Sequence, residues 1–309
     1  MTSLREPTPL AGPRADGART PVPGAASFAL RPLLSGPRRC ARVIAVFPSA
    51  VYLEYRSPAE PKVIALVSSD ATRLPNAVVV AARSRELPFG PVRQGDEAWI
   101  GDASLEIPAL RVRVRRWWDP SPVLGPISAV RLSHGAAALK TGSSQAPFGL
   151  AGHPGPVRLA ERCAAGDLAQ AVDAAERIVG LGPGLTPSGD DVLAGLLISL
   201  RLVGGSVLGG ESAIWLADWI GAAVTADAGT RTTALAATLL HCAAHGQAGA
   251  EVSAVLRAIA GQEPMAPALR RLLGAGHTSG ADLAWGVLAG CRATLALSGA
   301  AAQSRRATA

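Results

Sequence analysis

The chain has 309 residues, about twice a typical domain length, so one large domain or two smaller ones fit its size. Hydrophobic residues make up 49% and charged residues 17%, which excludes disorder along the whole chain. The net charge of +7 comes from residues 1–150, which hold 19 basic and 11 acidic residues, whereas residues 151–309 hold 11 and 12. Much of the excess lies in a Pro/Gly/Ala-rich leader, so we expect no nucleic-acid partner.

The N-terminal half contains two segments of different amino-acid composition. Residues 1–38 contain many Pro, Gly and Ala without periodicity, which predicts a disordered leader. Short β-branched runs separated by turn residues then predict a β-rich domain over residues 40–118. The expected strands span residues 42–47, 50–55, 62–67, 77–81, 97–100 and 110–115. Alternation in the last run places its arginines on one face, which favours a solvated sheet face over an anion-binding stripe.

Residues 119–156 are rich in Pro, Gly and Ser, and we predict a connector with one short helix around residues 129–139. Ala-rich segments with Gly at their ends then predict a tightly packed helical domain over residues 157–298, followed by a tail at residues 299–309. The expected helices span residues 159–179, 190–203, 212–225, 230–245, 250–260, 266–274 and 281–297. The predicted fold class is α+β, with an N-terminal β-rich unit followed by a C-terminal Ala/Gly-rich helical bundle.

The cysteine pattern and hydropathy favour a cytoplasmic protein. The four cysteines are widely spaced and form no C-x-x-C pair, as expected in a reducing compartment. The leader lacks the apolar run of a secretory signal. The most apolar stretch, residues 192–208, is interrupted by Arg201 and by several glycines, so we expect no membrane span.

Residues 180–191, Gly-Leu-Gly-Pro-Gly-Leu-Thr-Pro-Ser-Gly-Asp-Asp, predict a turn that leads into a helix. Ser188 and Asp191 have the spacing of a capping box, and Thr186 before a proline is an alternative cap. Three glycines in this turn allow positive φ and close approach of the backbone to a bound molecule. They are Gly180, Gly182 and Gly184.

A second segment, Gly276-His-Thr-Ser-Gly-Ala-Asp282, repeats this motif. Residues 188–195 and 279–286 share the pattern S-G-x-D-x-x-x-G. Two copies predict a pair of helix N-termini that face a common site; the alternative is two good caps, each with a small residue for close helix packing. The first copy carries an additional carboxylate, Asp190, where the second has Ala281, and this surplus favours a functional site.

Two adjacent carboxylates repel an anion at a helix N-terminus unless something compensates them. A divalent ion such as Mg²⁺, a nearby arginine, or a substrate that presents N–H groups would each do so. Arg231, beside Thr232, suits recognition of a carboxylate or phosphate, but an ion pair with Asp227 one helical turn away is an equal alternative. His277, inside the second turn, can titrate near neutral pH.

Three other patterns do not support a site. His241 and His245 stand one helical turn apart without a third ligand, so we expect no metal site there. Residues 135–141 resemble a phosphate-binding loop but lack its second glycine. No G-x-S-x-G pattern accompanies Ser188 or Ser279, so nucleophilic serine chemistry is not expected.

Residues 182–191, 231–233 and 276–282 together resemble the bacterial family typified by the AllH subunit of oxamate carbamoyltransferase. The resemblance extends over roughly residues 40–297, with distinctive motifs only after Val179. It implies a role in reversible carbamoyl transfer between carbamoyl phosphate and oxamate, which gives oxalurate and phosphate, in allantoin or purine nitrogen breakdown. It also implies a small anionic substrate and partnership with other subunits.

For such chemistry, the catalytic candidates are Asp190, Asp191, Arg231 and His277. The substrate-binding candidates are Gly182, Gly184, Thr186, Ser188, Gly189, Thr232, Thr278, Ser279, Gly280 and Asp282. We expect Arg231 to hold the anion, the amides after the two serines to bind the phosphate or carbonyl oxygen, and Asp190 or Asp191 to bind the substrate NH₂ group.

Two other function classes remain open. One is a non-catalytic subunit that binds a metabolite or serves as a scaffold. The other is a metal-assisted hydrolase that uses Asp190 and Asp191. No cofactor is expected, apart from the Mg²⁺ that these two carboxylates would allow.

Overall fold

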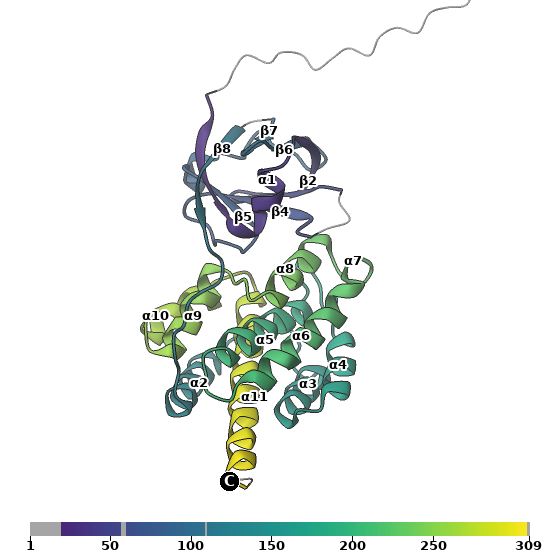
Figure 1. Ribbon diagram of the computed structural model, residues 1–309. Coiled ribbons are helices and arrows are strands. Elements are labelled where there is room, and N and C mark those ends of the chain that lie inside the picture. The colour runs from purple at the N-terminus through teal and green to yellow at the C-terminus, as the bar shows by residue number, and fades with distance from the viewer. Residues whose placement is uncertain (1–19, 57–59, 109, 308–309) are drawn as a thin grey trace, which may run out of the picture.

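The computed structural model describes residues 20–56, 60–108 and 110–307. A closed barrel of eight strands is followed by a helical region (Figure 1). The α+β class holds overall, but the fold prediction was wrong for the N-terminal part, where the strands form a closed barrel rather than simply a β-rich unit. Closure requires the first strand to pair with the last, and local sequence patterns do not reveal such distant pairing.

The strands of the barrel follow the order β1-β5-β4-β3-β2-β6-β7-β8. Their bounds are β1 (Val22–Ser27), β2 (Arg39–Phe47), β3 (Ala50–Glu54), β4 (Val63–Val67), β5 (Ala77–Val80), β6 (Glu97–Gly101), β7 (Ser104–Ile107) and β8 (Leu110–Trp118). The pairs β1/β8 and β4/β5 are parallel, and the others are antiparallel. In β8, Val112 and Val114 are buried while Arg111, Arg113 and Arg115 are exposed, so the alternating arginines form a solvated face.

The first strand lies within the predicted leader, so the leader prediction was wrong for residues 20–38, and residues 1–19 lie outside the described residues. Pro23 and Gly24 gave β1 the composition of a loop. A Cβ at Gly24 would lie 2.6 Å from Val112 Cγ1, so the glycine allows β1 to approach β8 at the point of closure. A short helix, α1 (Arg31–Leu34), follows before β2.

The helical region surrounds one buried helix, α5 (Ser188–Gly204). The other helices are α2 (Ala129–Ser143), α3 (Pro154–Ala165), α4 (Leu168–Glu176), α6 (Glu211–Ala226), α7 (Ala228–Arg231), α8 (Ala234–Ala244), α9 (Ala250–Ala260), α10 (Met265–Leu273) and α11 (Ser279–Ala307). The helix expected at residues 159–179 is two helices, because Gly166 ends α3 in the left-handed conformation and Asp167 caps α4. The predicted connector contains α2, which packs against α9 so closely that a Cβ at Gly135 would lie 2.8 Å from Ile259 Cα.

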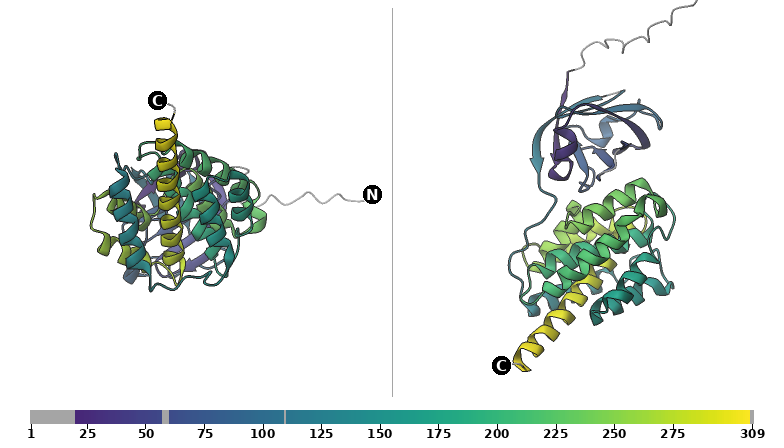
Figure 2. Two further views of the ribbon diagram at one scale, coloured as in Figure 1. Left: turned by 90° about the horizontal axis from the view of Figure 1, so that it is seen from below. Right: turned by 45° about the vertical axis from the view of Figure 1, so that its right-hand side comes forward.

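The long C-terminal helix α11 crosses the helical region and extends past the other helices at its C-terminal end (Figure 2). Among the described residues, its segment Ser279–Ala301 is the one stretch with the length and apolar composition of a membrane span. However, 56% of the most apolar 18-residue window in that segment is buried inside the protein, which is typical of a core helix. The helix packs chiefly against α5, and this pairing brings the two Ser-Gly turns together.

Candidate functional site

The two copies of S-G-x-D-x-x-x-G begin α5 and α11, and the glycine that ends each copy lies at the crossing of the two helices. A Cβ at Gly195 would lie 3.0 Å from the backbone nitrogen of Val287. A Cβ at Gly286 would lie 2.9 Å from the backbone nitrogen of Leu196, the equivalent residue of the other copy. The contacts are therefore reciprocal, and the two motifs are related by an approximate local twofold.

The carboxyl groups of the two motifs follow the same reciprocity. Asp191 is hydrogen-bonded by the Ser279 hydroxyl, and Asp282 is hydrogen-bonded by the Ser188 hydroxyl. Both aspartates are buried, with relative exposures of 6% for Asp191 and 0% for Asp282. In both, the Oδ2 atom is buried without a hydrogen-bond partner among the described residues. Thus each helix start supplies a serine to the other helix's carboxyl group.

One half of this pair is closed by the chain itself. The backbone N–H of Gly149 donates to Asp282 Oδ1 at 2.8 Å, and the Thr278 hydroxyl lies 3.5 Å from the Ser188 hydroxyl. A Cβ at position 149 would lie 2.9 Å from Asp282 Oδ2 and would collide with Ser188, so only glycine fits here. The preceding Phe148 stacks on Trp285 of α11, with ring centroids 5.5 Å apart.

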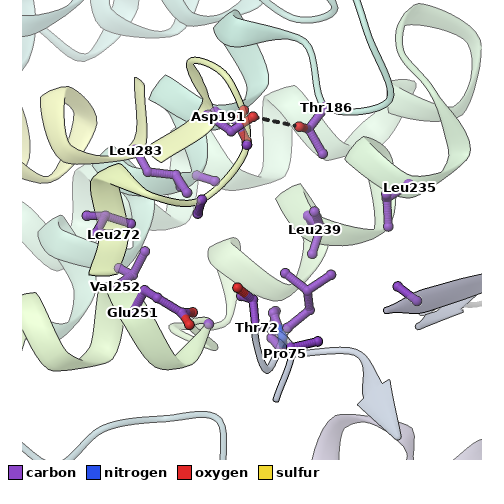
Figure 3. A pocket seen from close by; sticks show the side chains of 18 of the residues that line it. Thr72, Pro75, Thr186, Asp191, Leu235, Leu239, Glu251, Val252, Leu272 and Leu283 are labelled. Atoms are coloured by element: carbon purple, nitrogen blue, oxygen red, sulfur yellow. Dashed lines mark hydrogen bonds between the residues drawn. The ribbon is translucent and has the colours of Figure 1, made fainter. Parts of the chain in front are cut away.

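The other half opens into a cavity of about 480 Å³ between the helices and the barrel. Asp191 and Thr186 lie on its wall (Figure 3) together with Ser279, whose hydroxyl is 3.1 Å from that of Thr186. The position equivalent to Trp285 is Ala194, which also lines the cavity. The small side chain of Ala194 thus leaves open the space that Trp285 and Phe148 fill in the half of the pair around Asp282.

The barrel and the remaining helices complete the cavity. The barrel contributes residues of β3, β4 and the segment after β4, and α8, α9 and α10 supply largely apolar side chains. The main contributors are Tyr52, Asp70, Thr72, Leu74, Pro75, Leu235, Leu239, Glu251, Val252, Leu272 and Leu283. Figure 3 shows Thr72 and Pro75 on the side opposite Asp191.

Burial gives Asp191 the properties of a neutral acid at physiological pH. The pKa of Asp191 is raised to about 8, chiefly by burial and also by the nearby Asp282 and Asp190 carboxylates. Hydrogen bonds from the Ser279 and Thr186 hydroxyls lower the pKa and so oppose the shift. Burial also raises the pKa of Asp282, which the Gly149 N–H and the nearby hydroxyls counteract. A protonated Asp191 can donate one hydrogen bond and accept others.

Asp190, the surplus carboxylate of the first motif, anchors the turn. Its Oδ1 accepts the backbone N–H of Gly180 at 2.9 Å, and its Oδ2 accepts the Thr232 hydroxyl. Burial raises its pKa, while these two hydrogen bonds and the charge of Arg231 lower it. Both oxygens are therefore occupied within the chain, although the residue borders the cavity.

Arg231 does not line the cavity. Its guanidinium donates to the Glu176 carbonyl oxygen at the end of α4, and its Nη1 lies 3.3 Å from Asp227. The ion pair one helical turn away, the alternative considered from sequence, is thus present. The anion-binding role of Arg231 stays a prediction that these contacts do not favour.

His277 lies away from the cavity, and the backbone amides that follow the two serines are hydrogen-bonded within the chain. His277 is exposed and is not among the cavity-lining residues. The Gly189 N–H donates to the Leu181 carbonyl at 2.8 Å, and the Gly280 N–H donates to the Ala275 carbonyl at 3.0 Å, so the amides that follow the two serines are already used. The glycines at positions 182 and 184 adopt positive φ, as the turn requires.

Sequence reasoning missed several residues of the site. The N–H of Gly149 lies 133 positions from its acceptor, and no local pattern marks it. Glu251 and the barrel residues are likewise distant in sequence. Among the described residues, no group of three His, Cys, Asp or Glu side chains is placed to hold a metal ion. One signal was available, because position seven of the repeated motif is alanine in one copy and tryptophan in the other.

Residues 178–291 match the sequence model of the family described as oxamate carbamoyltransferase subunit AllH. The match contains both Ser-Gly turns, the crossing glycines and Arg231, so the resemblance is confirmed over these residues, a shorter span than the expected 40–297. The word subunit in the family's description implies other chains in a complex. No curated protein and no solved structure matches the chain.

Proposed function

Since residues 178–291 match the family of oxamate carbamoyltransferase subunit AllH, we propose that this chain is a cytoplasmic subunit of a carbamoyltransferase. It acts with other subunits on carbamoyl phosphate and oxamate, or a similar small carboxylate amide, in purine nitrogen breakdown. The observation that carries the proposal is the buried Asp191 carboxyl group, which lines a cavity at the paired helix starts of the matched region.

The reaction suits a neutral carboxylic acid. The amide nitrogen of oxamate attacks the carbonyl carbon of carbamoyl phosphate, the bond from that carbon to the phosphate oxygen breaks, and the nitrogen loses a proton, which leaves oxalurate and phosphate. Negative charge develops on the carbonyl oxygen as the nitrogen attacks. Asp191, protonated below its pKa of about 8, can donate a hydrogen bond to that oxygen, with Thr186 and Ser279 fixing its orientation.

The anionic parts of the reactants need positive charge, and no Lys, Arg or His among the described residues lines this cavity. We therefore assign the phosphate and the oxamate carboxylate to groups of another subunit, so that the complete site forms only in the complex. The same observation favours the second candidate, a non-catalytic subunit that binds a metabolite. The hydrolase alternative loses support because both oxygens of Asp190 are occupied within the chain.

The test is oxalurate phosphorolysis by the assembled complex. We expect Asp191→Asn to lower kcat by about 100-fold or more, because the amide is a much weaker donor to a developing negative charge. Asp218→Asn, on the exposed surface of α6, is the matched control and should retain full activity. Full activity of the Asp191→Asn complex would refute the catalytic role of Asp191. If the isolated chain nevertheless bound a metabolite in this cavity, that result would support the second candidate, a non-catalytic metabolite-binding subunit.

A further inference from the structure

Four of the side chains that line the cavity carry carboxyl groups. They are Asp70, Asp190, Asp191 and Glu251, and no described basic residue joins them. Two of their oxygens, Asp191 Oδ2 and Glu251 Oε2, are buried without a hydrogen-bond partner in the described part of the chain. Asp191 lies on α5 and Glu251 on the first turn of α9, so the two acceptors belong to different walls (Figure 3).

The closed half of the helix pair shows what such a carboxyl group accepts. There Asp282 receives the backbone N–H of Gly149, which the stacked Phe148 and Trp285 hold in place. The cavity takes the place of that segment beside Asp191. By the local twofold, an N–H group brought by a ligand would occupy the position that the chain's own N–H occupies next to Asp282.

We propose that this cavity binds a small uncharged or cationic molecule with N–H groups at both ends, such as a diamide, ureido or guanidino compound. One end donates to Asp191 and the other to Glu251. A buried carboxyl oxygen without a partner is costly, and each N–H donor offsets that cost. A carboxylate or phosphate at either end would bring no N–H donor and would lie beside these carboxyl groups instead. Aliphatic side chains of α8, α10 and α11 cover the middle of the ligand.

This inference goes beyond the proposed function, because it concerns what this chain binds by itself. The test is calorimetric binding to the full-length chain of malonamide, malonamate and malonate, which share one skeleton and carry two, one and no amide ends. Succinamide and succinate form a longer pair. Binding is measured at a pH of about 9, above the Asp191 pKa of about 8, where the carboxyl group is charged.

We expect a diamide to bind at least about tenfold more tightly than its dicarboxylate. Asp191→Asn and Glu251→Gln should each weaken diamide binding by about fivefold or more. Each should also reduce the ratio of diamide affinity to dicarboxylate affinity. Asp218→Asn, outside the cavity, should leave it unchanged. Glu251→Gln lies on a different helix from the paired motifs, so it keeps the test valid if Asp191→Asn does not fold.

Equal or tighter binding of the dicarboxylate, no binding of either diamide at millimolar concentration, or unchanged binding by both variants would each overturn the inference. Carbamoyl transfer by the assembled complex is measured separately. A complex without transfer activity would refute the proposed function and leave the diamide preference intact. An active complex whose isolated subunit prefers malonate would refute only the inference.

Discussion

Replacement of Asp191 by asparagine should change how the stability of the protein depends on pH. Burial raises the pKa of Asp191 from 3.8 to about 8 in the folded protein. Between these values the folded chain holds a proton that the unfolded chain releases, so the free energy of unfolding falls as the pH rises. The contribution is fully present below a pH of about 4 and is lost by about pH 8.

The size of the change in unfolding free energy follows from the pKa shift of Asp191. One proton of difference between the folded and unfolded states lowers the unfolding free energy by about 1.4 kcal/mol per pH unit. Over the whole window the loss reaches roughly 6 kcal/mol at most. Asparagine has nearly the same shape and no ionisation, so the variant lacks this contribution. Its stability relative to the wild type should therefore increase steadily from about pH 5 to pH 8.

The assay is urea unfolding followed by circular dichroism at 222 nm, which reports on the helices, at several pH values across the window. Asp218→Asn, an exposed residue paired with Arg201, controls for the substitution itself. Asp190 and Asp282 remain in both proteins, so the comparison reports on the removal of the Asp191 carboxyl group. A stability difference between Asp191→Asn and the wild type that does not vary with pH would refute the reasoning.

Three further substitutions test the packing of the paired motifs. Gly149→Ala should lower the free energy of unfolding by about 1–3 kcal/mol in urea unfolding, because the new methyl group collides with Ser188. An unchanged unfolding midpoint would contradict the close packing of Gly149 against Ser188. Gly286→Ala should destabilise by a similar amount at the helix crossing, whereas Gly299→Ala, in open space on the same helix, should be neutral or slightly stabilising. Ala194→Trp should fill the cavity and abolish diamide binding in calorimetry while the chain stays folded, and retained binding would place the ligand elsewhere.

The local parts of the fold could be predicted from the sequence. β-Branched runs marked six of the eight strands, and the end of the predicted helix at residue 179 is near the Gly-rich turn. The strand β1 was missed because Pro23 and Gly24 are typical of loops, although the glycine is needed where β1 meets β8. Barrel closure depends on that long-range pairing, which no local pattern encodes.

The candidate site could likewise be predicted from the sequence only in part. The repeated motif predicted that two helix starts meet, and reciprocal contacts of Gly195 and Gly286 explain its final glycine. The sequence could not tell which carboxylate stays free. Asp190 drew attention because it has no counterpart in the second copy, yet it anchors Gly180, and the matched Asp191 is the one that borders the cavity with an unpartnered oxygen.

A single position in the repeat decides which half of the pair is open. Trp285 provides the surface on which Phe148 stacks, and this contact delivers the Gly149 N–H to Asp282. Ala194 provides no such surface, and Asp191 Oδ2 stays buried without a hydrogen-bond partner among the described residues. Both carboxyl groups are desolvated on burial, but only Asp282 recovers a backbone hydrogen bond. The cost left at Asp191 is therefore available to strengthen the binding of a ligand that brings the missing donor.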